Sequence, residues 1–253
     1  MQASELFNQP NTILLDGGMG TMLQAAGMKL GTRPEDLNIE NPELIRSIHA
    51  KYAAAGSRVV NANTFGASPH KLADSKYTLE EVITAGIANC KQAVAPYGAL
   101  VTLDVGPLGE LLEPSGTLAF EDAVAEYGRI VRAGVAAGAD ILYFETFTDL
   151  YEMKAALLAA KENSTLPIMA SMSFEANGRT FTGCTVESFA ATARGLGANA
   201  VGINCSLGPK EIFPMAKRLA EAVPGDFPVF VKPNAGLPRA DGSGYDITPQ
   251  LYA

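Results

Sequence analysis

Acidic and thiol side chains follow several short apolar segments of the sequence, at the points where strands would end. Asp16, Glu145 and Cys205 have the most direct chemical use. The carboxylates could receive a substrate ammonium or transfer a proton, and the thiol could act as a nucleophile or a metal ligand. Each has a structural alternative, because strand-end acids also cap helices or form ion pairs, and cysteine is often a packed core residue. Two acids at separate strand ends nevertheless favour a functional site.

Other reactive side chains have weaker claims. Cys90 falls in a helical pattern and is expected in the core, Cys184 in a loop, and His70 on the surface. Gly17 belongs to a Gly-Gly-Met-Gly turn that fits neither common phosphate-binding motif, so we expect a tight turn that approaches a small ligand. Lys232 ends an apolar segment and is the one plausible Schiff-base lysine, which would suit a metal-free lyase or aldolase.

The elements that would position these residues alternate between β-branched segments and helical patterns, which is typical of a parallel sheet with crossover helices. We predict a (β/α)8 TIM-type barrel, whose active-site groups lie at the carboxyl ends of its strands. We expect a single domain, residues 1–253, with about seven of the eight β/α units and an incomplete C-terminus. Such an open barrel would expose apolar edges on its first and last strands. The predicted strands lie near residues 12–16, 58–63, 100–105, 141–145, 168–173, 200–204 and 229–232.

Two helices of this pattern have recognisable starts. Asn41 precedes Pro42 and is expected to cap a helix that contains His49. Asp149 followed by Glu152 resembles a capping box at the start of another helix.

Composition excludes several functional classes. The chain has 19 basic and 27 acidic residues, a net charge of -8 and no cluster of Lys or Arg, so no nucleic-acid partner is expected. No apolar stretch approaches the ~20 residues of a membrane helix. The N-terminus has no signal-peptide pattern, and three cysteines argue against a disulfide framework. We therefore expect a cytoplasmic protein without a membrane partner.

Together, the strand-end motifs resemble the homocysteine S-methyltransferase family, most closely the homocysteine-binding module of the cobalamin-dependent methionine synthase type. They occur in the family's order along nearly the whole chain, and the set is specific although each motif alone is weak. The matching segments are Leu15-Asp16-Gly17-Gly18-Met19-Gly20-Thr21-Met22-Leu23-Gln24, Asn63-Thr64-Phe65-Gly66-Ala67, Asp104-Val105-Gly106-Pro107, Phe144-Glu145-Thr146-Phe147 and Gly202-Ile203-Asn204-Cys205-Ser206-Leu207-Gly208-Pro209.

The resemblance implies a zinc-dependent methyl transfer to homocysteine that yields methionine. In this family three cysteinates hold the zinc, and Cys205 matches the one that follows the sixth strand. The other two form a Gly-Gly-Cys-Cys motif that this sequence lacks, so we expect an incomplete zinc site. Zinc would supply the substrate thiolate near neutral pH. Methylcobalamin, bound by another module, is the implied methyl donor.

The resemblance also implies how homocysteine is held. Glu145 would receive its ammonium, with Asp16 as a second candidate, and backbone N–H groups of one turn would receive its carboxylate. Catalytic roles fall to Cys205 and Glu145. The implied substrate-binding residues are Asp16, Thr64, Phe65, Gly66, Glu145 and Asn234, the last beside the metal.

Two further alternatives remain open at this point. One is a stand-alone homocysteine methyltransferase that uses S-methylmethionine or betaine. The other is a non-catalytic or degenerate barrel fragment without the full metal site, although retention of Asp16, Glu145 and Cys205 together argues against long decay.

Overall fold

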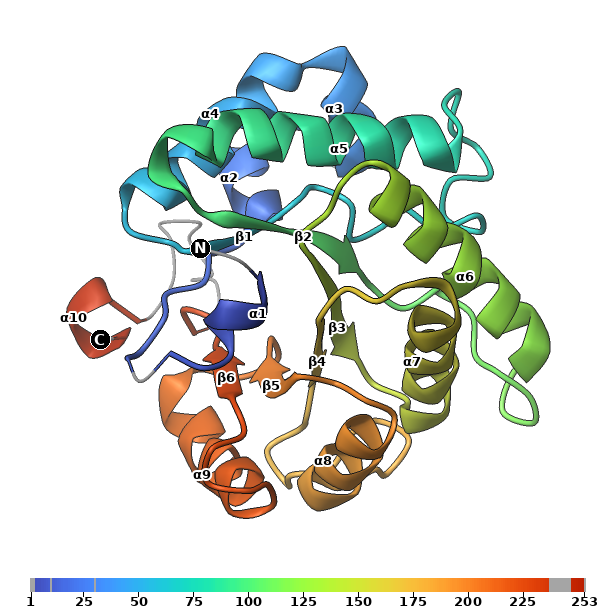
Figure 1. Cartoon of the computed structure of the whole chain (residues 1–253), viewed down its shortest axis with the longest axis vertical. Helices are drawn as coiled ribbons and strands as arrows, with labels where there is room; N and C mark the ends of the chain where they lie inside the picture. The colour runs from blue at the N-terminus through green and yellow to red at the C-terminus, as the bar shows by residue number, and fades with distance from the viewer. Residues whose placement is uncertain (1–2, 10, 30, 237–246, 253) are drawn as a thin grey trace.

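The protein forms one curled sheet of parallel strands surrounded by helices (Figure 1). This computed structural model describes residues 3–9, 11–29, 31–236 and 247–252. The strands are neighbours in chain order, from β1 to β6, and every pair is parallel. Their bounds are β1 Val59–Asn61, β2 Leu100–Val105, β3 Ile141–Phe147, β4 Ile168–Met172, β5 Ala200–Asn204 and β6 Val229–Lys232.

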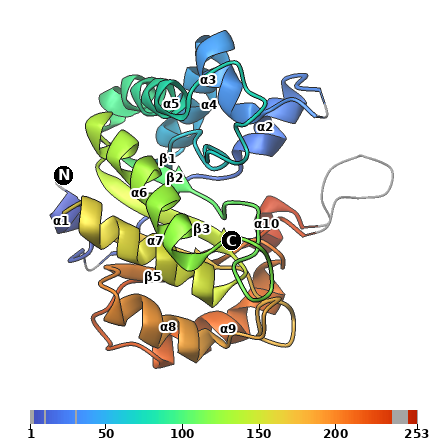
Figure 2. The ribbon, with the colours of Figure 1, turned by 90° about the vertical axis from the view of Figure 1, so that its right-hand side faces the viewer.

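Helices connect consecutive strands and cover the outer surface of the sheet. Figure 2, the ribbon turned by 90°, shows α6 and α7 between α5 and α8. This arrangement confirms the predicted α/β barrel class, as a partial (β/α) barrel. The helices are α1 Ala3–Leu6, α2 Met19–Ala25, α3 Leu37–Glu40, α4 Pro42–Ala54, α5 Leu79–Val94, α6 Phe120–Ala136, α7 Leu150–Asn163, α8 Val186–Gly195, α9 Pro209–Glu221 and α10 Pro249–Tyr252, with 3-10 turns η1 Pro34–Asp36 and η2 Ala95–Tyr97.

The first predicted strand, residues 12–16, does not form a regular strand. It makes a single bridge, between Leu15 and Val59, with flanking hydrogen bonds from Asp16 N to Val59 O (3.2 Å) and from Arg58 N to Leu14 O (2.9 Å). The bridge does not extend into a ladder, because Leu15 with Val59 is the one bridged pair that this segment makes among the described residues. The bridge still brings Asp16 to the carboxyl end of the sheet, where the prediction placed it.

The two edges of the sheet are partly exposed. Leu14 is 57% exposed beside β1, and Val231 is 43% exposed on β6. Within the described residues β6 pairs with β5 alone. Such exposed apolar side chains agree with the open edges expected from the sequence.

Two apolar layers hold the barrel together. The larger lies between the sheet and its helices and includes Val60, Leu103 and Phe144, which are all fully buried. The smaller lies inside the barrel and consists of residues such as Val59, Ile141, Tyr143 and Met169, with Leu6 of α1 packed against them. These side chains make the lower interior apolar, so the polar groups of a site are expected at the carboxyl ends of the strands.

The expected helix starts are confirmed in one case and corrected in another. Asn41 caps α4, since its side chain accepts from Leu44 N at 3.3 Å. Asp149 caps α7 through Tyr151 N at 3.1 Å. Glu152 does not complete a capping box. Its carboxylate is buried and accepts from Leu108 N at 2.8 Å and Tyr127 Oη at 2.9 Å, two tertiary donors that no local pattern could reveal.

Across the described ranges, no helix combines the length and apolar character needed to cross a membrane.

His49 makes stability depend on pH in a defined direction. Its imidazole is fully buried in α4, and neither ring nitrogen has a hydrogen-bond partner among the described residues. Burial lowers the pKa of His49 from 6.5 to about 4. Between pH 6.5 and about 4, His49 is protonated in the unfolded chain but neutral in the folded chain. The free energy of unfolding therefore decreases as the pH drops through that range.

We expect a His49→Leu variant to lose this part of the pH dependence. Wild-type free energy of unfolding should fall relative to the variant by about 1.4 kcal/mol for each pH unit below about 6.5. Urea unfolding at several pH values between these limits measures both proteins, and other titrating groups contribute equally to both. If the free energies of unfolding of the two proteins changed in parallel with pH, His49 would not be neutral in the folded state.

Candidate functional site

A cavity of about 1320 Å³ opens at the carboxyl ends of the strands and extends along the gap between residues 13–15 and β6. Of the sequence-predicted site residues, five line it: Asp16, Phe65, Glu145, Cys205 and Asn234. Thr64 and Gly66 do not belong to its lining. The fold therefore gathers most of the predicted residues around one space, although they come from distant parts of the chain.

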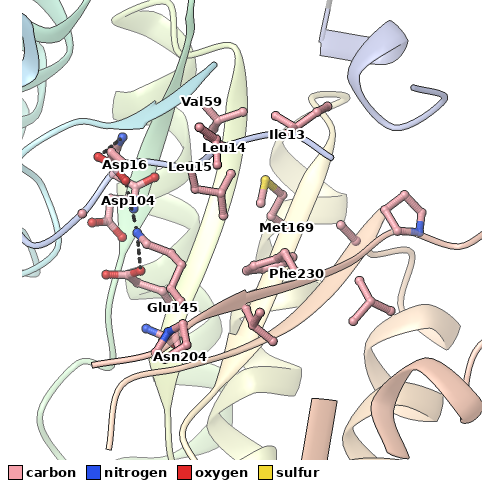
Figure 3. Close-up of a pocket in the computed structure, with 18 of the residues that line it drawn as sticks. Ile13, Leu14, Leu15, Asp16, Val59, Asp104, Glu145, Met169, Asn204 and Phe230 are labelled. Atoms are coloured by element: carbon pink, nitrogen blue, oxygen red, sulfur yellow. Dashed lines mark hydrogen bonds and ion pairs between the residues drawn. The ribbon is translucent and has the colours of Figure 1, made fainter. Parts of the chain in front are cut away.

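A buried lysine connects the two predicted carboxylates. Lys232 Nζ lies 3.2 Å from Asp16 Oδ1 and 3.6 Å from Glu145 Oε2. The second Asp16 oxygen accepts from Asn61 N at 2.8 Å. Figure 3 shows Asp16, Asp104 and Glu145 gathered at one end of the cavity, with dashed lines for these interactions. The side chains of Lys232 and Asp16 are only 16% and 5% exposed, so solvent screens their attraction weakly.

Lys232 carries a positive charge at this position. Burial by itself would lower the pKa of Lys232, but the carboxylates of Asp16, Glu145 and Asp104 outweigh it and raise that pKa. A Schiff base needs a neutral amine. The charged state therefore argues against the lyase or aldolase alternative and gives Lys232 the role of a counter-ion.

Asp104, near the end of β2, adds a third acid to the cluster. It is 6% exposed, and its pKa is raised well above the usual value by burial and by the neighbouring charge of Glu145. Among the described residues that line the cavity, Lys232 is the only basic one. Three carboxyl groups thus share one ammonium, and the raised pKa of Asp104 shows that Lys232 does not fully offset burial and the charge of Glu145. A second cation at this end of the cavity would favour the ionised form of Asp104.

Cys205 lies across from this cluster in a strained turn. Cys205 and Ser206 have φ values of 59°, and Thr146 has a φ of 63°. Such left-handed conformations are rare in residues other than glycine, most of all for a β-branched side chain, and they cluster at functional sites.

Asn204 holds the strained residues together. Its side chain accepts from Thr146 N at 3.1 Å and from Ser171 Oγ at 2.8 Å, and it donates to Thr146 Oγ1 at 2.7 Å. Thr146 Oγ1 in turn lies 3.7 Å from Cys205 Sγ. The network fixes the ends of β3 and β5 relative to each other, which points the Cys205 thiol at the cavity.

The described cysteines do not assemble a metal centre. Cys90 is buried in the core beside Val60 O, as expected, and Cys184 Sγ lies 3.2 Å from Thr185 O at the start of α8. In the described part of the chain, no three His, Cys, Asp or Glu side chains could hold an ion together. Burial also raises the pKa of Cys205, so this thiol is not a thiolate at neutral pH by itself.

Two backbone N–H groups of the predicted carboxylate-binding turn, Thr64 to Gly66, already have partners within the protein. Thr64 N donates to Ala62 O at 2.8 Å, and Gly66 N donates to Glu35 Oε1 at 2.7 Å. Thr64 Oγ1 donates to Asp104 O and accepts from Asp104 N. Thr64 is therefore a positioning residue for Asp104 in this structure. Gly66 could receive a substrate carboxylate only by exchanging its partner.

Gly17 makes room for a protein side chain. A Cβ at this position would lie 2.9 Å from the Tyr52 ring and hydroxyl, and that hydroxyl donates to Gly18 O at 3.0 Å. The sequence predicted a turn whose backbone approaches a small ligand, and that approach stays a prediction. The close contact that the structure shows at Gly17 is with Tyr52 of α4, because the turn packs against this helix.

Sequence reasoning missed three site roles. It quoted Asp104 and Asn204 only within motifs, and it weighed Lys232 only as a nucleophile. All three end or nearly end a strand, at β2, β5 and β6. That position was the available signal, but their pairing depends on distances between strands that are remote in sequence.

The ion cluster predicts a large stability cost when its lysine is removed. Lys232→Met would leave buried carboxylates without their counter-ion, which costs about 3–5 kcal/mol. The matched control is Lys91→Met, whose lysine lies 3.1 Å from Asp140 but is 41% exposed. That exposed pair contributes about 1 kcal/mol or less. Equal losses in urea unfolding of the two variants would contradict the assigned role of Lys232.

The sequence of this chain matches a known protein family. The model of the homocysteine S-methyltransferase family matches residues 13–253. A methionine synthase from Mycobacterium tuberculosis (strain ATCC 25618 / H37Rv) is 30% identical over 258 residues, which cover 94% of this chain and 21% of that protein. The chain thus spans about a fifth of that relative's length.

Comparison with solved structures points to the same family. The metallated form of the homocysteine methyltransferase MmuM from Escherichia coli matches with a TM-score of 0.82 at 25% identity, covering 92% of this chain and 86% of that one. The carboxyl transferase domain of Rhizobium etli pyruvate carboxylase, at 14% identity and a TM-score of 0.57, shares the fold alone. The family match over almost the whole chain decides the question: this chain belongs to the homocysteine S-methyltransferase family.

Proposed function

We propose that this chain is the homocysteine-binding barrel of a methyltransferase of the methionine synthase type. Homocysteine would enter the strand-end cavity with its ammonium at the carboxylates and its sulfur toward Cys205. The observation that carries the proposal is the acidic cluster of Asp16, Asp104 and Glu145, which holds one ammonium and attracts another. An α-amino acid supplies such a group.

The reaction itself is a substitution at carbon. The homocysteine sulfur loses its proton and attacks the methyl carbon of the donor, so that a sulfur–carbon bond forms as the bond between the methyl group and its carrier breaks. A zinc ion of the kind implied by the family resemblance would lower the pKa of this thiol. The described residues provide one suitable ligand, Cys205, and do not fit a three-thiolate site. We therefore assign to this chain the binding and orientation of homocysteine and no step at the metal.

Two methyl donors follow from the two kinds of relative. The strand-end motifs most resemble the cobalamin-dependent type, which favours methylcobalamin delivered by another module, and a methionine synthase is among the relatives. The likeness to a homocysteine methyltransferase of Escherichia coli keeps a stand-alone enzyme, with a donor such as S-methylmethionine, as the second candidate. Mass spectrometry of any methionine formed from homocysteine with each donor separates them, and we expect any product to require methylcobalamin. Homocysteine binding without product from either donor would support the non-catalytic alternative.

Homocysteine binding by calorimetry is the direct test of the proposed function. Glu145→Gln removes one charged acceptor of the ammonium, and a hydrogen bond to a charged group contributes about 1.5–3 kcal/mol. We therefore expect binding to weaken about 10- to 100-fold. Glu162→Gln makes the same chemical change at an exposed site on α7 and should leave affinity unchanged. A wild-type chain that fails to bind homocysteine would refute the proposal.

A further inference from the structure

Two buried hydroxyl groups lie next to each other inside the barrel. They belong to Tyr143 of β3 and Ser171 of β4, and their oxygens are 2.9 Å apart. Neither residue is part of the cavity lining. A buried hydroxyl without a partner is costly, so the protons of both groups need acceptors. The pair can affect a bound ligand only through the residues that it contacts.

The neighbours of this pair fix the direction of its hydrogen bonds. Asn204 Oδ1 accepts from the backbone N–H of Thr146 at 3.1 Å, which identifies this side of the amide as its oxygen. Ser171 Oγ lies 2.8 Å from the same oxygen and is therefore the donor. A serine hydroxyl has one proton, so Tyr143 must donate to Ser171. The chain of donors thus runs from Tyr143 through Ser171 to Asn204.

The opposite side of the Asn204 amide faces the thiol. Its two N–H groups donate to Thr146 Oγ1 at 2.7 Å and to Cys205 Sγ at 3.6 Å. The Thr146 hydroxyl lies 3.7 Å from the same sulfur. Two bonds to the amide oxygen keep the amide nitrogen towards Cys205, and one of these bonds comes from Ser171. The sulfur therefore depends on a serine that lies outside the cavity wall.

We propose that Ser171 and Tyr143 are positioning residues for Cys205, and that they act in series through the Asn204 amide. The inference deepens the proposed function, on which it rests in one respect: the substrate sulfur would point toward the thiol that they hold. Cys205 and Thr146 have left-handed backbone conformations, which persist only where surrounding contacts fix them. The chain supplies one such contact from β4, a strand that carries none of the acidic or thiol groups of the site.

Tyr143 also contacts the acidic side of the cavity. Lys232 Nζ lies 5.5 Å from the centroid of the tyrosine ring, within range of a cation–π contact. The ring of Tyr143 thus contacts the counter-ion of the acidic cluster, and its hydroxyl begins the donor chain. A phenylalanine at this position keeps the first contact and loses the second, so the hydroxyl can be tested by itself.

The reaction of Cys205 with iodoacetamide tests the proposal. Mass spectrometry of the digested protein gives the alkylation rate of each cysteine in the folded chain. Cys184, half-buried at the start of α8, is the reference within the same molecule, and Cys90, buried in the core, reports unfolding. The rate at Cys205 relative to Cys184 therefore measures the placement of one thiol. Homocysteine is absent, so failure of homocysteine binding in calorimetry refutes the proposed function and is a separate result.

We expect Ser171→Ala to lower the relative alkylation rate of Cys205 about 3- to 10-fold, the equivalent of one hydrogen bond. The rate falls because the turn relaxes and the sulfur no longer faces the open cavity. Tyr143→Phe should act in the same direction. The double variant should react no more slowly than Ser171→Ala, since the Tyr143 hydroxyl acts only through Ser171.

Ser57→Ala is the matched control. It removes another buried serine hydroxyl, which donates to Leu15 O at 3.1 Å, and should leave the relative rate unchanged. An unchanged rate in Ser171→Ala would overturn the proposal, as would losses in the two single variants that multiply in the double variant. If alkylation of Cys90 shows that Ser171→Ala is partly unfolded, Tyr143→Phe decides, and a wild-type rate in that variant overturns the assignment.

Discussion

The Lys232 ammonium, buried among the carboxylates of Asp16, Glu145 and Asp104, is the interaction on which the barrel mouth depends. Burying four ionisable groups is expensive unless they compensate one another. Here the compensation is partial, because acids outnumber the base. The result is a site that is stable enough to fold and still attracts a cation, which is the property a receptor for an amino acid needs.

Four separate segments of the barrel each contribute one member of this cluster. The bridge of Leu15 with Val59 delivers Asp16, β2 delivers Asp104, β3 delivers Glu145, and β6 delivers Lys232. Parallel strands bring their carboxyl ends to the same edge, so residues more than two hundred positions apart meet at hydrogen-bond distance. The apolar side chains below, with Leu6 among them, form the smaller apolar cluster, and several of them line the same cavity.

The thiol side of the cavity is shaped by strain. Thr146 and Cys205 have left-handed backbone conformations, which cost free energy. Two hydrogen bonds between the Asn204 amide and Thr146 offset part of that cost. A relaxed strand end would turn the Cys205 thiol elsewhere. The acidic cluster and the thiol thus line one cavity, as the proposed binding of a substrate with an ammonium and a sulfur requires.

The sequence by itself determined the barrel class, five of the strands nearly to the residue, and the presence of Asp16, Glu145 and Cys205 at one end of the sheet. Alternating local patterns carry that information, because period and punctuation depend on near neighbours. Only the tertiary structure decided that Lys232 is a counter-ion, that Glu152 bonds Tyr127, and that residues 12–16 reduce to one bridge. Those outcomes depend on distances, burial and charge between remote segments, to which local sequence patterns are blind.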